Sequence, residues 1–153
     1  MNIIFLDVDG VLNSIKHLKE EYYKNQRPYS GFEYPFDSDC MNNLKILVES
    51  TNAYLVITST WRKFDIGKKI LLFELKKYDL DKKVIGYTNI LNTKRGEEIK
   101  DFLSKLSCDV NYIILDDDSD FDDLHKYLIK TDYRYGLTYN NVETAIKKLN
   151  KVK

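Results

Sequence analysis

The stretch that decides the fold is residues 3–12, which read Ile-Ile-Phe-Leu-Asp-Val-Asp-Gly-Val-Leu. Residues 3–8 form a short apolar run without helical periodicity, which is typical of a strand buried on both faces. Asp9-Gly10 then ends the strand. Because side chains two residues apart on a strand point to the same face, we expect Asp7 and Asp9 to project together toward a crevice above the sheet.

Similar runs and intervening helical patterns recur along the rest of the chain. The further strand-like runs lie at residues 54–57, 84–85 and 112–115. Apolar residues at helical spacing lie within residues 38–48, 65–75, 93–106 and 142–149. Strands that alternate with helices build βαβ units and a mainly parallel sheet. The sequence therefore predicts an α/β fold, a three-layer Rossmann-like sandwich with its ligand site at the carboxyl ends of the strands.

Length and charge limit the classes of protein. The chain has 153 residues, which predicts a single domain over residues 1–153 at roughly 100–200 residues per domain. Lys plus Arg and Asp plus Glu both number 24, so no overall field attracts a nucleic acid, and any polyanion must be held locally. No apolar stretch reaches the about 18 residues that span a bilayer, and the start lacks a basic leader. We expect a cytoplasmic protein without membrane contact.

The two cysteines, Cys40 and Cys108, lie in no metal-binding spacing. Two cysteines cannot build a disulfide framework. We expect both to be core thiols without a disulfide partner.

A second acidic group follows another apolar run. Asp116, Asp117 and Asp118 end the strand predicted at 112–115, so a parallel sheet brings them to the same edge as Asp7 and Asp9. Carboxylates about 4 Å apart repel by roughly 4 kcal/mol at an effective dielectric of 20, and a hard cation relieves this. Oxygen ligands without His or Cys suit Mg²⁺ better than Zn²⁺. The sequence predicts a magnesium site here.

Two further features suit a phosphate group. Three hydroxyl residues, Thr58, Ser59 and Thr60, end the strand predicted at 54–57, where hydroxyls and backbone N–H groups bind phosphate oxygens. Arg95, or alternatively Lys94, lies in the first turn of a predicted helix, where a cation opposes the helix dipole. An unfavourable charge at this position indicates a ligand.

Taken together, these residues resemble the four motifs of the haloacid dehalogenase (HAD) superfamily in their order, namely residues 7–12, 58–60, 94–95 and 114–117. Four segments are more closely similar to the small HAD domains of Swiss Army Knife RNA repair proteins: Thr-Ser-Thr-Trp-Arg at 58–62, Gly-Tyr-Thr at 86–88, Arg-Gly-Glu-Glu-Ile at 95–99 and Gly-Leu-Thr at 136–138. Those domains are also similar to the phosphatase half of polynucleotide kinase-phosphatases. The resemblance covers nearly the whole chain and implies a HAD-like phosphatase.

The resemblance also implies a role for each matching residue. Asp7 would be the nucleophile that forms an aspartyl-phosphate, and Asp9 would be the general acid and base. The Mg²⁺ ligands would be Asp7, Asp9, Asp116 and Asp117, with Asp118 entering if the strand ends one residue later. The phosphate ligands would include one hydroxyl of Thr58, Ser59 or Thr60, with Ser59 favoured as the expected strand terminus.

Three cations are further candidates for contact with the phosphate, and alternatives stay open for them. Arg95 would hold two phosphate oxygens with its fork, unless Lys94 is the true match. Arg62 would be either a second phosphate contact or a solvent-facing partner of Asp65.

Little of the chain is left to form a cap over this site. We expect residues 15–37 to form an irregular Tyr-rich loop. One helix, one strand and a loop account for residues 62–94, so we expect the fold to be uncapped or minimally capped. An open site favours a large phosphorylated substrate, such as a nucleic-acid end or a phosphoprotein. The following side chains of the loop would either stack bases or form a small aromatic cluster: Tyr22, Tyr23, Arg27, Tyr29, Phe32, Tyr34 and Phe36.

The sequence thus predicts a Mg²⁺-dependent phosphomonoester hydrolase that acts on nucleic-acid termini. The alternative among enzymes is a nucleotidase or another small-molecule phosphatase, which the zero net charge favours. The alternative of another class is a non-catalytic phosphoacceptor or interaction module, which would leave Asp9 without a purpose. The preference for DNA or RNA, for a 3′ or 5′ phosphate, and the oligomeric state stay open.

Overall fold

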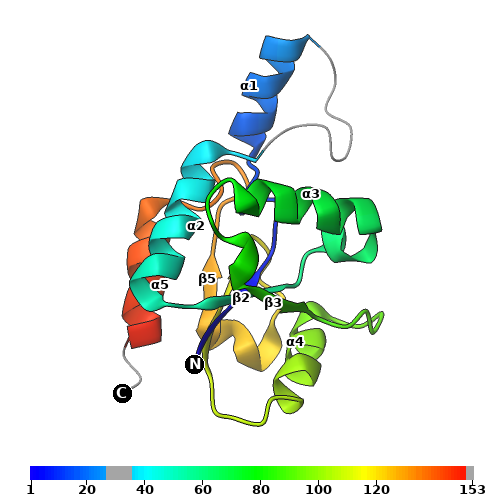
Figure 1. Ribbon diagram of the computed structural model, residues 1–153, viewed down its shortest axis with the longest axis vertical. Helices are drawn as coiled ribbons and strands as arrows, with labels where there is room; N and C mark the ends of the chain where they lie inside the picture. Colours follow the sequence, from blue (N-terminus) through cyan, green and yellow to red (C-terminus); the bar gives the residue numbers. More distant parts are fainter. Residues whose placement is uncertain (27–35, 151–153) are drawn as a thin grey trace.

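The computed structural model describes residues 1–26 and 36–150. The described strands are β1 (Asn2–Leu6), β2 (Tyr54–Ile57), β3 (Val84–Tyr87), β4 (Asn111–Asp116) and β5 (Leu128–Lys130). The described α-helices are α1 (Ile15–Asn25), α2 (Ser38–Thr51), α3 (Asp65–Lys76), α4 (Arg95–Ser104) and α5 (Tyr139–Asn150) (Figure 1). Short 3₁₀ helices lie at η1 (Thr60–Lys63), η2 (Asp81–Lys83) and η3 (Asp122–Tyr127).

The five strands form one sheet in the order β3-β2-β1-β4-β5, and every neighbouring pair is parallel. β1 is the central strand, and its last residue, Leu6, pairs in register with Ile57 of β2 and Leu115 of β4. The predicted α/β fold with a parallel sheet is therefore confirmed.

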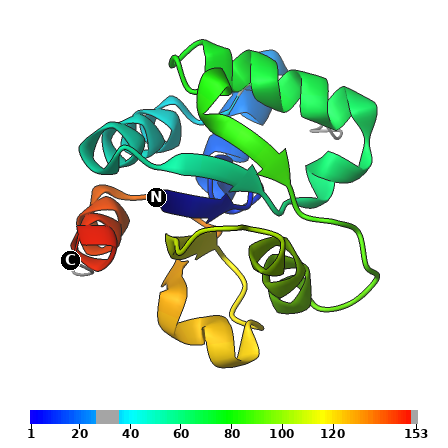
Figure 2. The same ribbon diagram turned by 60° about the horizontal axis from the view of Figure 1, so that its bottom comes forward.

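Helices cover both faces of this sheet and make three layers (Figure 2). Alternate residues of β1 serve the two faces, because successive strand side chains point in opposite directions. Ile4 and Leu6 pack into the larger cluster, with α2, α3 and α5. Ile3 and Phe5 pack into the smaller cluster, with α4 and η3.

Two elements depart from the sequence prediction. The start of the expected loop at 15–37 is an 11-residue helix, α1, which begins after the Ser14 cap and ends at Asn25, where Gln26 in the left-handed region is the C-cap. No residue of α1 is buried, so its sequence lacks the apolar stripe by which a core-facing helix is recognised. It projects away from the rest of the molecule at the top of Figure 1. The other departure is β5, whose three residues are too few for a recognisable strand pattern.

Smaller corrections concern β1 and one cysteine. β1 ends at Leu6, before Asp7 and Val8, so the strand alternation does not extend to Asp9. Cys40 is a buried thiol as expected, whereas Cys108 is exposed, and both are free. Within residues 1–26 and 36–150, no helix is long and apolar enough to cross a membrane.

Candidate active site

The ends of three neighbouring strands place Asp7, Thr58 and Asp116 side by side. The ladder continues one residue beyond Leu6, because Asp7 N–H donates to Leu115 O at 3.0 Å and Thr58 N–H donates to Leu6 O at 2.9 Å. Residues in register on parallel strands point to the same face. Alternation from Ile3 and Phe5 assigns this row to the face that α4 covers. The sheet therefore brings a carboxylate, a hydroxyl and a second carboxylate together below the start of α4.

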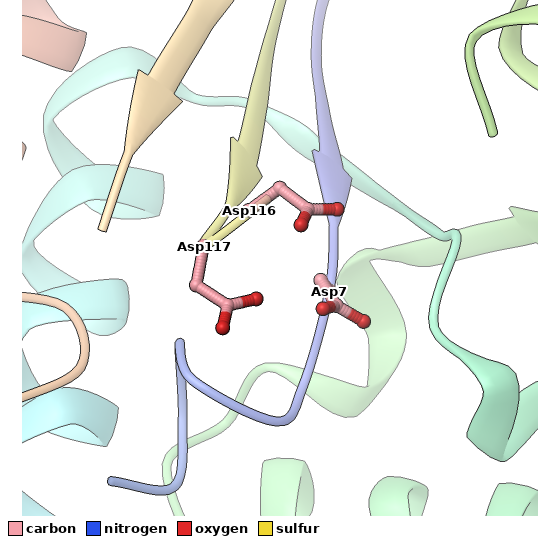
Figure 3. Close-up of side chains that lie close together, drawn as sticks. All are labelled: Asp7, Asp116 and Asp117. Carbon is pink, nitrogen blue, oxygen red and sulfur yellow. The ribbon is translucent and has the colours of Figure 1, made fainter. Parts of the chain in front are cut away.

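Asp7, Asp116 and Asp117 form the acidic cluster of the site (Figure 3). Each offers one carboxylate oxygen, and these oxygens lie within 4.8 Å of one another. Asp7 and Asp116 are buried, and Asp117 is half-buried. Burial, followed by the charge of Asp7, raises the pKa of Asp116 and that of Asp117. An oxygen-only cluster that is costly to leave charged fits a hard divalent cation such as Mg²⁺.

Gly10 makes room for this cluster. Its φ is +77°, and a Cβ atom built on it would lie 2.5 Å from Cγ of Asp117. A larger residue would therefore be strained and would push Asp117 out of place. Asp118 lies outside the cluster: it is exposed, and its carboxylate accepts the N–H groups of Ser119 and Asp120 in its own loop. β4 ends at Asp116, as expected, and not one residue later, which is the case in which Asp118 would enter the site.

Arg95 and Lys94 have separate environments. The Arg95 guanidinium reaches back from the first turn of α4, with Nη1 3.2 Å from Oδ2 of Asp7 and in contact with Oδ2 of Asp116. Burial alone would lower the pKa of Arg95, but the charges of Asp7 and Asp116 outweigh it and raise the pKa. Lys94 points to solvent and pairs with Asp120 and Asp122. Of the two cations, only Arg95 touches the acidic cluster.

Asp9 lies apart from the three clustered carboxylates and is exposed. Its Oδ2 accepts a hydrogen bond of 2.8 Å from Nε1 of Trp61. Although the residue as a whole is exposed, its carboxyl group is partly buried, and this burial raises the pKa of Asp9 above its ordinary value despite the opposing hydrogen bonds from Trp61 and Asn13. The structure therefore does not bring the Asp9 carboxylate into the predicted metal cluster. Trp61 is the single tryptophan of the chain and follows the hydroxyl triplet directly, which is the signal that sequence reasoning did not use.

The three candidate hydroxyl residues differ in burial and in hydrogen bonding. Thr58 is fully buried, and its Oγ1 has no hydrogen-bond partner among the described residues. Ser59 is also buried, but its Oγ caps η1 by accepting Trp61 N–H. Thr60 is exposed. β2 ends at Ile57, so the hydroxyl residue next to the strand end is Thr58 rather than the expected Ser59. Of the three, Thr58 is the residue that lies beside Asp7 at the strand ends, and its buried hydroxyl has no hydrogen-bond partner among the described residues.

Arg62 is neither exposed nor paired with Asp65. Its side chain is 3% exposed and forms an ion pair with Glu98, whose side chain is 7% exposed. The five N–H groups of the guanidinium meet protein acceptors: Thr58 O, Ser59 O, Thr88 O, Asn89 O and Oε2 of Glu98. Burial lowers the pKa of Arg62, while the Glu98 charge raises it. In this arrangement no N–H of Arg62 is left for a phosphate oxygen.

A polar cleft of about 250 Å³ opens beside Arg95. Its walls include Thr60, Lys63, Asn92, Thr93 and Asp118. The site therefore has open space next to the cation that touches Asp7.

This arrangement is typical of a HAD-type site. A parallel sheet carries an Asp-x-Asp-Gly turn after its central strand and a hydroxyl at the end of the next strand, while the start of α4 supplies a cation and the end of β4 supplies an acidic pair. The family described as the HAD domain in Swiss Army Knife RNA repair proteins matches residues 3–142, and the chain belongs to this family. No curated protein and no solved structure matches the chain.

Proposed function

We propose that this protein is a Mg²⁺-dependent phosphomonoester hydrolase that works through an aspartyl-phosphate on Asp7 and acts on the phosphorylated ends of nucleic acids. The observation that carries the proposal is the row of Asp7, Thr58 and Asp116 at three strand ends, with Arg95 Nη1 3.2 Å from Asp7 Oδ2. Membership of the HAD family supports a phosphatase or hydrolase.

In the proposed first step, an Asp7 carboxylate oxygen attacks phosphorus, and the bond from phosphorus to the ester oxygen breaks. Asp9 donates a proton to that leaving oxygen. Thr58 Oγ1 and the Arg95 fork bind the non-bridging oxygens, which carry the negative charge. In the second step, Asp9 takes a proton from water, the water oxygen attacks the phosphorus, and the bond to Asp7 breaks to release inorganic phosphate.

Asp7, Asp116 and Asp117 would hold the Mg²⁺ ion, because their oxygens already lie within 4.8 Å of one another. The ion would screen the charge of Asp7 from that of the phosphate. Among the described residues, Arg95 is the cation that pairs with the two buried carboxylates, Asp7 and Asp116, so a divalent cation would relieve the remaining negative charge.

The proposed substrate is a phosphate on a polynucleotide end. Between β1 and α2, the described residues form one helix, α1, rather than a cap domain, so a large substrate can approach the site. α1 carries Tyr22 and Tyr23, which are 45% and 70% exposed and suited to base stacking. The family description, which refers to RNA repair proteins, supports the same choice.

A small-molecule phosphatase is the competing proposal, and the equal numbers of acidic and basic residues favour it. The test is Mg²⁺-dependent phosphate release from a panel of 3′- and 5′-phosphorylated DNA and RNA oligomers, mononucleotides and phosphopeptides. We expect the highest kcat/KM with an oligonucleotide end. Equal values for an oligomer and the matching mononucleotide would favour the small-molecule phosphatase, and release without Mg²⁺ would contradict the proposed chemistry.

A further inference from the structure

Arg62 joins three segments of the chain that surround the site. Its Nη1 donates to Thr58 O and, at 2.9 Å, to Ser59 O in the turn that carries the buried hydroxyl. Its Nε donates to Thr88 O at 2.9 Å, just after β3. Its Nη2 donates to Oε2 of Glu98 on α4. One guanidinium therefore fixes the end of β2, the end of β3 and the first turns of α4 relative to one another.

Glu98 connects this arrangement to Arg95. The two residues are three positions apart on α4, and side chains at this spacing lie on the same face of a helix. The second carboxylate oxygen of Glu98 accepts Leu91 N–H at 3.1 Å, which also ties down the loop that leads into α4. The start of α4 has no side-chain cap of its own, because its N-cap residue, Lys94, makes none. The Arg62–Glu98 pair is thus a buried anchor one turn from the guanidinium that reaches Asp7.

We infer that Arg62 and Glu98 are positioning residues that hold Arg95 and Thr58 at the separation the phosphate requires, and that Arg62 is not itself a phosphate ligand. The inference rests on the proposed function, since Arg95 and Thr58 are the proposed phosphate ligands. A rigid fork is needed for this task, because a lysine ammonium cannot reach Thr58 O, Thr88 O and Glu98 at once.

Nuclear magnetic resonance of the arginine side chains tests the inference without relying on activity. The full chain contains four arginines, so the Nε–H signal of Arg95 can be assigned by substitution. We expect Glu98→Gln to shift or broaden the Arg95 signal while the Arg134 signal stays in place. Glu97→Gln is the matched control, because Glu97 is the neighbouring residue on α4 but is exposed and pairs with Lys100. Arg62→Lys provides a second variant if the amide at position 98 preserves the contact.

A mutant cycle measures the same coupling in catalysis of p-nitrophenyl phosphate hydrolysis. We expect Glu98→Gln to lower kcat/KM about tenfold in the wild-type chain but by a smaller factor in the Arg95→Ala background, because the part of its effect that passes through Arg95 is then absent. A merely structural role would lower both by the same factor.

An unmoved Arg95 signal in both Glu98→Gln and Arg62→Lys, or equal losses in both backgrounds, would overturn the inference. If the wild-type chain releases no phosphate from any substrate, the proposed function fails, and the Arg95 signal still decides whether the pair positions that side chain.

Discussion

The Nε1 group of Trp61 donates a hydrogen bond of 2.8 Å to Oδ2 of Asp9, across 52 positions of sequence. The indole ring also packs edge-to-face on Phe36, at 5.1 Å between ring centroids. Phe36 directly precedes the cap residue of α2, Asp37. Trp61 therefore links the proposed general acid to the segment that enters α2.

This contact predicts a leaving-group effect. Trp61→Phe keeps an aromatic ring at this position but removes the N–H donor. It should lower kcat for alkyl phosphates about tenfold while lowering it less than threefold for p-nitrophenyl phosphate, whose leaving group needs little protonation. Phe36→Leu is the control that disturbs packing without removing the donor. An equal loss for both substrates would show that Trp61 acts through the fold alone.

The same variant predicts a shift in the pH profile. The Trp61 hydrogen bond lowers the pKa of Asp9, against the raising effect of burial. Without it the pKa of Asp9 rises, and the protonated form needed in the first step persists to higher pH. The alkaline limb of kcat should therefore move to higher pH in Trp61→Phe. A shift toward acid would contradict Asp9 as the general acid.

A pair of substitutions distinguishes Thr58 from Ser59 as the proposed phosphate ligand. Thr58→Val keeps the shape of a fully buried residue and removes a hydroxyl that has no described partner, so the free energy of unfolding should not fall. Catalysis should suffer, with kcat/KM about ten- to a hundredfold lower, because a phosphate oxygen loses its donor. Ser59→Ala should change kcat/KM by less than about threefold. The reverse order would assign the phosphate to Ser59.

The acidic cluster predicts how stability depends on pH in the absence of metal. Burial, followed by the charge of Asp7, raises the pKa of Asp116 from 3.8 to about 7. The folded state therefore holds a proton that the unfolded state has lost, so the free energy of unfolding should fall as pH rises from about 4 to about 7. Saturating Mg²⁺ should raise the melting temperature most at and above neutral pH, because it binds the deprotonated carboxylates.

Thermal unfolding with EDTA or Mg²⁺ checks this, and EDTA should also abolish activity until Mg²⁺ is restored. Asp116→Asn should flatten the pH dependence of the metal-free protein and remove the Mg²⁺ effect. Asp109→Asn, at an exposed position outside the cluster, should change neither. Stability of the metal-free protein that rises between pH 4 and 7, or activity that requires Zn²⁺, would argue against the magnesium site.

The exposed tyrosines of α1 predict substrate preference. Tyr22→Ala and Tyr23→Ala should each lower kcat/KM for a phosphorylated oligonucleotide by about 5- to 150-fold, the range of one lost base stack at about 1–3 kcal/mol. Hydrolysis of p-nitrophenyl phosphate should not change. Phe73→Ala, on α3 and 62% exposed, is the control aromatic. Unchanged kcat/KM for oligonucleotides in both tyrosine variants would remove α1 from the substrate path.

Sequence reasoning worked where a pattern has a single physical cause. The strands at 54–57 and 112–115 were located because buried parallel strands are short apolar runs. α1 was missed because its stability does not come from a buried face. The other residues expected to stack bases or cluster in the segment 15–37, namely Arg27, Tyr29, Phe32 and Tyr34, lie outside the described residues.

The details of the site needed three-dimensional contacts. Ser59 was favoured over Thr58 because a strand end cannot be placed to one residue from its sequence. In the structure β2 ends at Ile57, which pairs with Leu6. Arg62 was expected at the phosphate or in solvent, since nothing in the sequence shows that Glu98, 36 positions away, is its partner. The metal set included Asp9 because strand alternation was extended past Leu6, where β1 has already ended.

Asp7→Asn should abolish turnover and leave the fold intact, because the amide keeps the shape of the carboxylate but is no nucleophile. Asp9→Asn should be nearly as severe for alkyl phosphates. Circular dichroism and steady-state rates measure the two effects. More than about a tenth of wild-type activity in Asp7→Asn would exceed what the loss of a nucleophile allows.

The most direct test of the central claim is to trap the phosphorylated protein. Asp9→Asn, with p-nitrophenyl phosphate and Mg²⁺, should release p-nitrophenol in a burst and accumulate a phosphoenzyme, because the base for the second step is missing. Acid quenching and peptide mass spectrometry should then place one phosphate on Asp7, with none in the Asp7→Asn/Asp9→Asn double variant. Phosphate on another residue, or a burst of p-nitrophenol from Asp9→Asn without any phosphoenzyme, would contradict an aspartyl-phosphate on Asp7.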